Sequence, residues 1–255
     1  MDVGFITCNP KERLNFARKN NFKHIEINSP FFNKSNKSPE IGGRDISLSF
    51  HAPLELSLAV QLEDLMAANV HYYKKLTDLA EKTGAEWITL HLGAYLSYFL
   101  SEEQALDLSI SSLNELTSYA EKKRIILAVE NFRNSRKDPY PYFQLGTKIE
   151  DFEKIFGLID SPYLKICFDI GHANITSRNP AEYIKTFGRK IHSVHVHDNF
   201  GEEDKHLPCG YGNIRWAEII QELKKSGFNG KLVIESEDNP ETMLSSKKFL
   251  ENLIQ

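Results

Sequence analysis

The stretch HVHDNFGEEDKH, residues 195–206, concentrates groups that bind cations or move protons. It holds three histidines and four acids within twelve residues. Imidazole and carboxylate groups are good ligands for divalent metals, and both serve as general acids and bases. A solvated polar loop has the same composition. The interpretation therefore depends on where the neighbouring elements of the chain place these side chains.

Residues of the same kinds recur at the ends of predicted strands. Short runs rich in β-branched and apolar residues predict eight strands, at 3–8, 24–28, 46–51, 87–91, 125–130, 164–169, 192–197 and 231–235. Side chains alternate across a strand, so residues two apart share a face. On the last six runs, one face carries a metal-binding or proton-transferring side chain at its carboxyl end: His51, His91, Glu130, Asp169, His195 and Glu235.

The two faces of these six runs differ in a consistent way. Small residues such as Ser49, Ala128 and Cys167 lie behind the polar tips. The opposite faces carry only large apolar residues: Leu48, Phe50, Ile88, Leu90, Leu127, Val129, Ile166, Phe168, Val194, Val196, Leu232 and Ile234. In a barrel of parallel strands the apolar faces pack on outer helices, and the other face lines the lumen. We therefore expect the polar tips to meet at the carboxyl mouth of a barrel.

Helical periodicity separates the predicted strands. The candidate helices are 10–20, 61–83, 102–123, 148–159, 179–189, 215–227 and 240–254. The segment SPFFNKSNKSPEIGGRD, residues 29–45, is rich in turn-forming residues and predicts a loop. Eight strands alternating with helices predict an α/β fold, a single (β/α)8 TIM barrel domain over residues 1–255. An open doubly wound sheet is the alternative.

A metal site follows from the chemistry of the mouth. Carboxylates gathered at one place repel each other, and a divalent cation offsets this repulsion. The expected ligand set contains no thiolate, so Zn²⁺, Mn²⁺, Co²⁺ and Fe²⁺ all remain open. Asp204 and His206, with His172 after the sixth strand, predict a second or third metal position, or contacts to substrate oxygens.

Other polar residues of this region are candidate substrate contacts. His197 shares the face of His195, and it could also orient a metal ligand. Glu26 on the second strand faces the same lumen. The glycines of LPCGYG, residues 207–212, are only a weak signal for phosphate binding. The substrate-binding candidates are His172, His206, Lys205, Glu26 and His197.

Composition restricts the partners. A formal net charge of −4 provides no overall positive field to attract nucleic acid or an anionic membrane. Three scattered cysteines do not form a disulfide framework, and we find neither a secretory signal nor a long apolar run. We expect a cytoplasmic protein with no membrane contact. The oligomeric state stays open.

Six short motifs occur in an order that resembles a known superfamily. They are FHAP, LHLG, VENF, CFDIGHAN, HVHDN followed by DKHLPCGYG, and VIES. The chain is similar to the xylose isomerase-like TIM barrels, which include sugar phosphate isomerases and epimerases and also endonuclease IV. The resemblance implies that one catalytic metal is held by Glu130, Asp169, His195 and Glu235. It also implies that Glu130 and Glu235 exchange protons with the substrate and that His172 contacts the sugar.

The endonuclease IV branch implies a different chemistry. Its trinuclear zinc cluster adds ligands at five positions, and all five are present: His51, His91, His172, Asp204 and His206. Three departures favour the isomerase branch. Leu54, directly after FHAP, stands where endonuclease IV has an aromatic residue. The DTCH turn of endonuclease IV is DIGH here, with Gly171 in its third position. Its HxNDSK run is HVHDNF here, with His197 in its third position. We also find no cluster of basic residues interleaved with aromatic residues, which is the pattern expected of a DNA-binding surface.

The resemblance therefore predicts a divalent-metal-dependent isomerase or epimerase with one to three Zn²⁺ or Mn²⁺ ions per chain. Its substrate would be a sugar or sugar phosphate, and protons would be transferred next to a carbonyl. The alternative is an endonuclease IV-like zinc phosphodiesterase that acts on abasic-site DNA.

Overall fold

Eight parallel strands form the centre of the molecule. The structure is a computed structural model that describes residues 1–28, 45–134, 142–177 and 179–255. Its strands close into a barrel in the order β1-β10-β9-β8-β6-β4-β3-β2. Because β1 pairs with both β2 and β10, the predicted barrel is confirmed and the open sheet is wrong. The barrel strands are β1 (Asp2–Thr7), β2 (His24–Ile27), β3 (Ser47–His51), β4 (Trp87–Leu90), β6 (Ile126–Glu130), β8 (Leu164–Asp169), β9 (Ile191–Val196) and β10 (Lys231–Ile234).

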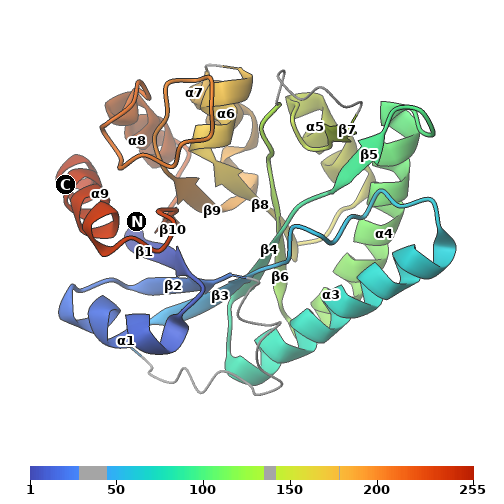
Figure 1. Cartoon of the computed structure of the whole chain (residues 1–255), viewed down its shortest axis with the longest axis horizontal. Helices are drawn as coiled ribbons and strands as arrows, with labels where there is room; N and C mark the ends of the chain where they lie inside the picture. The colour runs from blue at the N-terminus through green and yellow to red at the C-terminus, as the bar shows by residue number, and fades with distance from the viewer. Residues whose placement is uncertain (29–44, 135–141, 178) are drawn as a thin grey trace.

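Helices surround this barrel (Figure 1). The helices at 102–123 and 240–254 begin at side-chain caps: Ser101 forms a capping box with Gln104, and Asn239 accepts the N–H groups of Glu241 and Thr242. All seven predicted helices are present within a few residues of their expected bounds. The helices of the described chain are α1 (Pro10–Lys19), α3 (Glu63–Thr83), α4 (Glu102–Lys123), α5 (Ile149–Leu158), α6 (Ile170–Thr176), α7 (Pro180–Phe187), α8 (Trp216–Lys225) and α9 (Pro240–Ile254), with a 3₁₀ turn η1 (Gly188–Lys190).

Two features were not predicted. The antiparallel pair of β5 (Ala94–Leu96) and β7 (Tyr142–Gln144) lies outside the barrel sheet. Three residues are too few to show an alternating pattern, so the sequence carries no clear signal for these strands. The helix α6 was expected to be a turn. It forms because the Asp169 carboxylate caps it by accepting the His172 N–H at 2.6 Å. The loop predicted for 29–45 lies, except for Asp45, outside the described residues.

The two faces of the barrel strands are separated as expected. A small buried apolar cluster of Ile6, Trp87, Ala128, Cys167 and Val233 lies in the lumen. The twelve apolar residues of the opposite faces belong to the larger core, which includes the buried side chains of the helices. Burial on both sides of the strands leaves their carboxyl ends as the place where polar side chains gather.

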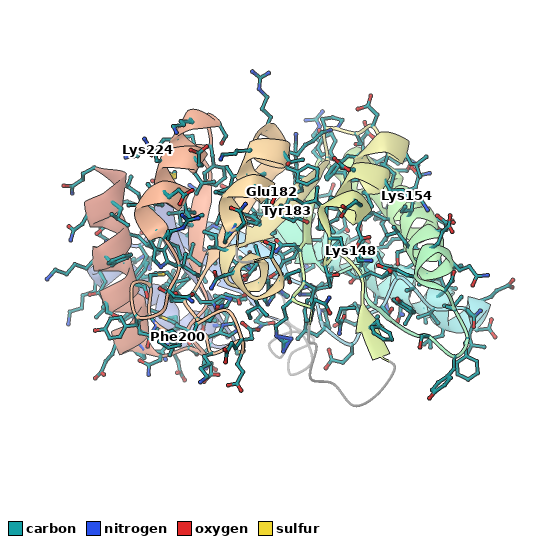
Figure 2. The ribbon with its side chains drawn as sticks, turned by 90° about the horizontal axis from the view of Figure 1, so that it is seen from above. Lys148, Lys154, Glu182, Tyr183, Phe200 and Lys224 are labelled. Carbon is teal, nitrogen blue, oxygen red and sulfur yellow. The ribbon has the colours of Figure 1, made fainter. Side chains whose placement is uncertain are left out.

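The mouth and the floor of the barrel lie at opposite edges of the molecule. In Figure 2, Phe200 in the loop after β9 marks one edge, and Lys224 near the end of α8 marks the other. Among the residues that the structure describes, no helix combines the length and the apolar composition that crossing a membrane requires.

Candidate metal centre and active site

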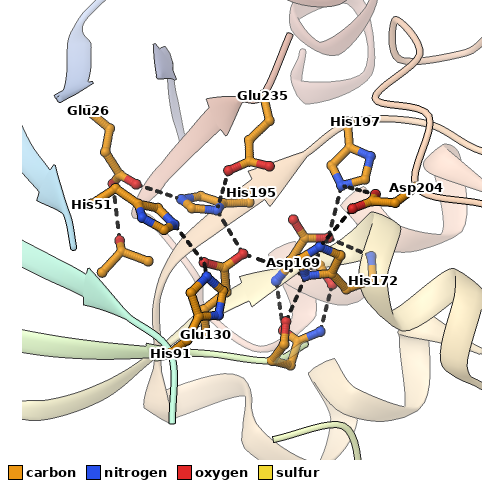
Figure 3. Close-up of polar contacts among 12 residues, drawn as sticks. Glu26, His51, His91, Glu130, Asp169, His172, His195, His197, Asp204 and Glu235 are labelled. Carbon is orange, nitrogen blue, oxygen red and sulfur yellow. Dashed lines mark hydrogen bonds and ion pairs between the residues drawn. The ribbon is translucent and has the colours of Figure 1, made fainter. Parts of the chain in front are cut away.

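Glu130, the last residue of β6, is the centre of the polar cluster (Figure 3). Its Oε2 lies 3.1 Å from Nε2 of His51 and 3.3 Å from Nε2 of His91. Its Oε1 lies 3.2 Å from Nδ1 of His195. Only 1% of Glu130 is exposed. The ends of β3, β4, β6 and β9 therefore bring their polar tips to one buried carboxylate.

A second carboxylate reaches the same imidazole. Glu235 follows β10, and its Oε1 lies 3.1 Å from Nδ1 of His195. His51, Glu130, His195 and Glu235 each offer one ligand atom, and these four atoms lie within 4.8 Å of one another. Both glutamates with the expected proton-transfer role thus face one point at the mouth.

Asp169 lies in a neighbouring group with His172 and His197, whose ligand atoms also fall within 4.8 Å of one another. Nε2 of His197 is 3.3 Å from Oδ1 of Asp169. This differs from the expected set, in which Asp169 joins Glu130, His195 and Glu235. The two groups are nevertheless adjacent, because Nδ1 of His172 is 3.7 Å from Oε1 of Glu130.

The loop after β9 completes this second group. Oδ2 of Asp204 lies 3.3 Å from Nε2 of His172 and 3.4 Å from Nε2 of His206. The other ring nitrogen of His206 lies 3.4 Å from Oε2 of Glu235. All nine residues implied as ligands therefore lie in one continuous network of short polar contacts.

Asp198 holds the loop that carries Asp204 and His206. Its carboxylate is fully buried and accepts hydrogen bonds from the Gly210 N–H at 2.9 Å and from the Trp216 indole at 2.7 Å. A Cβ atom at Gly212 would overlap the Asp198 carboxylate. Gly212 of LPCGYG thus makes room for a buried anchor, and a bound phosphate is not needed to explain it.

Acidic partners keep His172 and His206 charged. Burial alone would lower the pKa of His172, but Asp169 and Asp204 together with Glu130 raise that pKa to about 10. Burial also opposes the charge of His206, whose pKa is nevertheless raised to about 9, with Asp204 as the strongest partner. In the absence of a metal, protons on these imidazoles balance the carboxylates.

The glutamates show the reverse effect. Burial alone would raise the pKa of Glu130, but the imidazoles of His195 and His91 hold it well below its usual value. Burial also opposes the charge on Glu235, yet His195 lowers the pKa of this carboxyl too. Both glutamates are therefore ionised at neutral pH, the state that ligates a cation or accepts a proton.

Several buried polar atoms of the cluster lack a hydrogen bond. They are Oδ2 of Asp169, Oδ1 of Asp204, Nδ1 of His91 and both ring nitrogens of His197. Leaving such an atom unsatisfied costs about 1–3 kcal/mol. Carboxylate oxygens and imidazole nitrogens are the donors that Zn²⁺ and Mn²⁺ accept. The residues present therefore fit one or more divalent cations.

The remaining candidates are placed differently. Lys205 pairs with Glu203 at 3.3 Å, and 52% of its side chain is exposed, so the structure does not bring it into the cluster. Glu26 is fully buried, with one carboxylate oxygen 2.9 Å from Nε2 of His195.

Two site residues were missed by sequence reasoning. Asn131 links the ends of β6 and β8: its amide donates to the Asp169 carbonyl at 2.9 Å and accepts the Asp169 N–H at 2.8 Å. Arg133 lies 3.2 Å from Asp204. Their positions in VENFRN, directly after a strand that ends in glutamate, are the signal that could have found them.

Gly171 is expected to be required for the placement of His197. A Cβ atom at Gly171 would overlap the His197 ring, which is 1% exposed and stacks on His206 at 4.1 Å between ring centres. We expect Gly171→Ala to lower the free energy of unfolding by about 1–3 kcal/mol through overpacking. Urea unfolding of the chelator-treated protein measures this.

The matched control is Gly157→Ala in α5, where an added Cβ meets nothing within 4 Å. That variant is expected to gain about 0.5–1 kcal/mol, because alanine favours a helix more than glycine does. Equal stability of the two variants would contradict the steric role of Gly171.

Comparison with known proteins agrees with the fold. The uncharacterized protein MJ1311 of Methanocaldococcus jannaschii is 33% identical over 217 residues, which are 83% of this chain and 71% of that protein. D-psicose 3-epimerase of Enterocloster bolteae is 30% identical over 127 residues, 50% of this chain and 38% of the relative. A probable endonuclease 4 of Geobacillus is 23% identical over 66% of this chain and 58% of the relative.

Solved structures share the whole barrel. A crystal structure of a D-tagatose 3-epimerase-like protein superposes with a TM-score of 0.87 at 27% identity, covering 100% of this chain and 97% of that one. A family model described as xylose isomerase-like TIM barrel matches residues 15–253. The chain therefore belongs to the xylose isomerase-like TIM barrel family.

Proposed function

We propose that the protein is a divalent-metal-dependent isomerase or epimerase that acts on a small sugar or sugar phosphate. The observation that carries this proposal is the convergence of Glu130 and Glu235 on Nδ1 of His195, at 3.2 and 3.1 Å. At this buried point an ionised carboxylate can accept the proton next to a carbonyl, and the resulting carboxylic acid can return it to the substrate. The relatives described as sugar epimerases support the substrate class.

Glu130, His195 and Glu235 would hold the metal together with His51 or Asp169. A bound Zn²⁺ or Mn²⁺ ion would polarise the substrate carbonyl and so acidify the neighbouring C–H group. The buried surroundings of Glu130 exclude water from that point, which strengthens every charge interaction there.

The two glutamates differ in their exposure to solvent. Glu235 is 9% exposed, against 1% for Glu130, so a substrate that enters the mouth meets Glu235 first. We therefore assign the first proton abstraction to a carboxylate oxygen of Glu235. His206 contacts both Glu235 and Asp204, and His172 contacts Asp204. Ring N–H groups of these two imidazoles would hydrogen-bond to substrate hydroxyls.

Exchange of substrate hydrogen for deuterium tests the proposal. The metal-loaded protein is incubated in D₂O with D-psicose, D-tagatose and their phosphates, and ¹H NMR follows the C–H group next to the carbonyl. We expect exchange and a new epimer or isomer with at least one of these sugars. Absence of exchange with the whole panel by protein that retains its metal would overturn the proposal.

A phosphodiesterase of the endonuclease IV type is the second candidate. It is favoured by the five further candidate ligands, because His51 and His91 contact Glu130, and His172 and His206 contact Asp204. Near one tightly held metal per chain in elemental analysis supports the isomerase. Near three, with nicking of an abasic-site duplex at catalytic enzyme concentration, would establish the phosphodiesterase instead.

A further inference from the structure

Glu26 occupies an unusual place for a carboxylate. It lies on β2 inside the barrel and is fully buried, paired with Ser49 and therefore deeper than the strand end at His51. Its Oε1 is 2.9 Å from Nε2 of His195, and its Oε2 accepts the hydroxyl groups of Ser49 at 2.6 Å and Thr89 at 3.2 Å. His195 therefore stands between Glu26 and the point where Glu130 and Glu235 meet.

The two nitrogens of His195 face different carboxylates. Nε2 faces Glu26, whereas Nδ1 faces Glu130 and Glu235. A ring nitrogen that carries hydrogen cannot ligate a metal, so the tautomer decides whether His195 can bind. A hydrogen bond from Nε2–H to Glu26 retains the hydrogen on that nitrogen and leaves the lone pair of Nδ1 directed at the site.

We propose that Glu26 is a positioning residue of the metal centre, which acts through His195 and does not touch the substrate. This inference rests on the proposed function, since it assigns His195 as a metal ligand. Carboxylates that accept the second N–H of a ligating histidine fix its ring and raise its basicity. The expected substrate contact of Glu26 does not fit its position, because His195 separates Glu26 from the mouth.

The floor of the barrel holds Glu26 in turn. Ser49, which donates to Glu26, also lies 2.9 Å from Nε2 of His24. His24 stacks on Trp87 with 4.4 Å between the ring centres and 12° between the planes. The polar contacts thus continue from the buried aromatic floor through Ser49 and Glu26 to His195, which leaves the Glu26 carboxylate little freedom to move.

Metal affinity measures the role directly. Glu26→Gln keeps the shape and one acceptor oxygen but removes the charge, and we expect the dissociation constant for Zn²⁺ to rise about 10- to 100-fold. Competition with a chromophoric chelator provides the value without an activity assay. At saturating metal, kcat should recover towards the wild-type value, because Glu26 does not touch the substrate.

The matched control is Asp151→Asn. Asp151, in the first turn of α5, is also a buried carboxylate and is 4% exposed. It accepts the N–H of Gly146, and no contact described for it reaches the cluster. Its Zn²⁺ affinity should stay within about twofold of the wild type. Wild-type affinity of Glu26→Gln, or an equal loss in Asp151→Asn, would overturn the positioning role.

A second variant covers the case in which Glu26→Gln does not fold. Ser49→Ala removes a hydrogen bond to Glu26 and leaves the charge in place. We expect a smaller loss of Zn²⁺ affinity, about threefold or more. Wild-type affinity of Ser49→Ala would then count against the proposal.

One measurement separates this inference from the proposed function. If the wild-type protein binds no divalent metal, the proposed function fails, and the Glu26–His195 hydrogen bond can still be examined without metal. Long-range ¹H–¹⁵N spectra should show the Nε2–H of His195 as a slowly exchanging signal that is lost in Glu26→Ala. Identical signals in both proteins would overturn the inference.

Discussion

Replacement of Glu130 by glutamine is expected to lower turnover by about 10²- to 10⁴-fold, the range for loss of an acid–base group. Glu130 contacts His51, His91 and His195 within 3.3 Å and is a proposed metal ligand. The uncharged glutamine side chain therefore also removes a negative charge that stabilises a bound cation. We therefore expect metal affinity to fall together with kcat. Deuterium exchange and chelator competition on the same preparation measure the two losses.

Asp151→Asn again serves as the control for Glu130→Gln, because it neutralises a buried carboxylate outside the cluster. Its turnover should remain within about twofold of the wild type. Circular dichroism shows whether each variant is folded before activity is compared. A folded Glu130→Gln protein with wild-type turnover would remove Glu130 from the proposed mechanism and shift the assignment to Glu235 alone.

Removal of the metal is expected to abolish activity and to lower the melting temperature by about 5–15 °C. A ligand at 100 to 1,000 times its dissociation constant stabilises the folded state by about 2.7–4.1 kcal/mol. In a protein of this size each kcal/mol corresponds to about 2–4 °C. Thermal unfolding before chelation, after chelation and after metal is restored measures the change. An unchanged melting temperature would contradict a tightly bound metal.

The loss of stability on metal removal should grow with pH. In the metal-free protein the pKa values of His172 and His206 are raised to about 10 and about 9. A raised histidine pKa stabilises the fold fully below the unfolded value, near 6.5, and this contribution is lost as the pH rises through the folded value. A cation bound beside these imidazoles disfavours their charged form, so the metal-loaded protein depends less on these protons. The difference in melting temperature should therefore widen from pH 6.5 to 9.

Strand positions were readable from the sequence because alternation is a local property. Leu127 and Val129 point to the helices while Ala128 and Glu130 point inwards, and no other part of the chain is needed to see this. The short elements β5, β7 and α6 were missed because they are too short to show a periodic pattern and depend on particular contacts. Asp169 begins α6 through a single side-chain contact to the His172 N–H, which residue pattern alone did not reveal.

The sequence by itself determined the barrel and the strand ends that His51, His91, Glu130, Asp169, His195 and Glu235 occupy, and from these it predicted the chemistry of the mouth. Only the tertiary structure decided which of these side chains meet. Glu26 and His195 are 169 residues apart in the chain and become neighbours because the barrel closes around its lumen. Asp169 meets His197 because β8 and β9 are neighbouring strands, whereas His172 is only three residues from Asp169 in the chain. Alternation decides which face a side chain takes, whereas contacts across the lumen depend on the stagger of all eight strands.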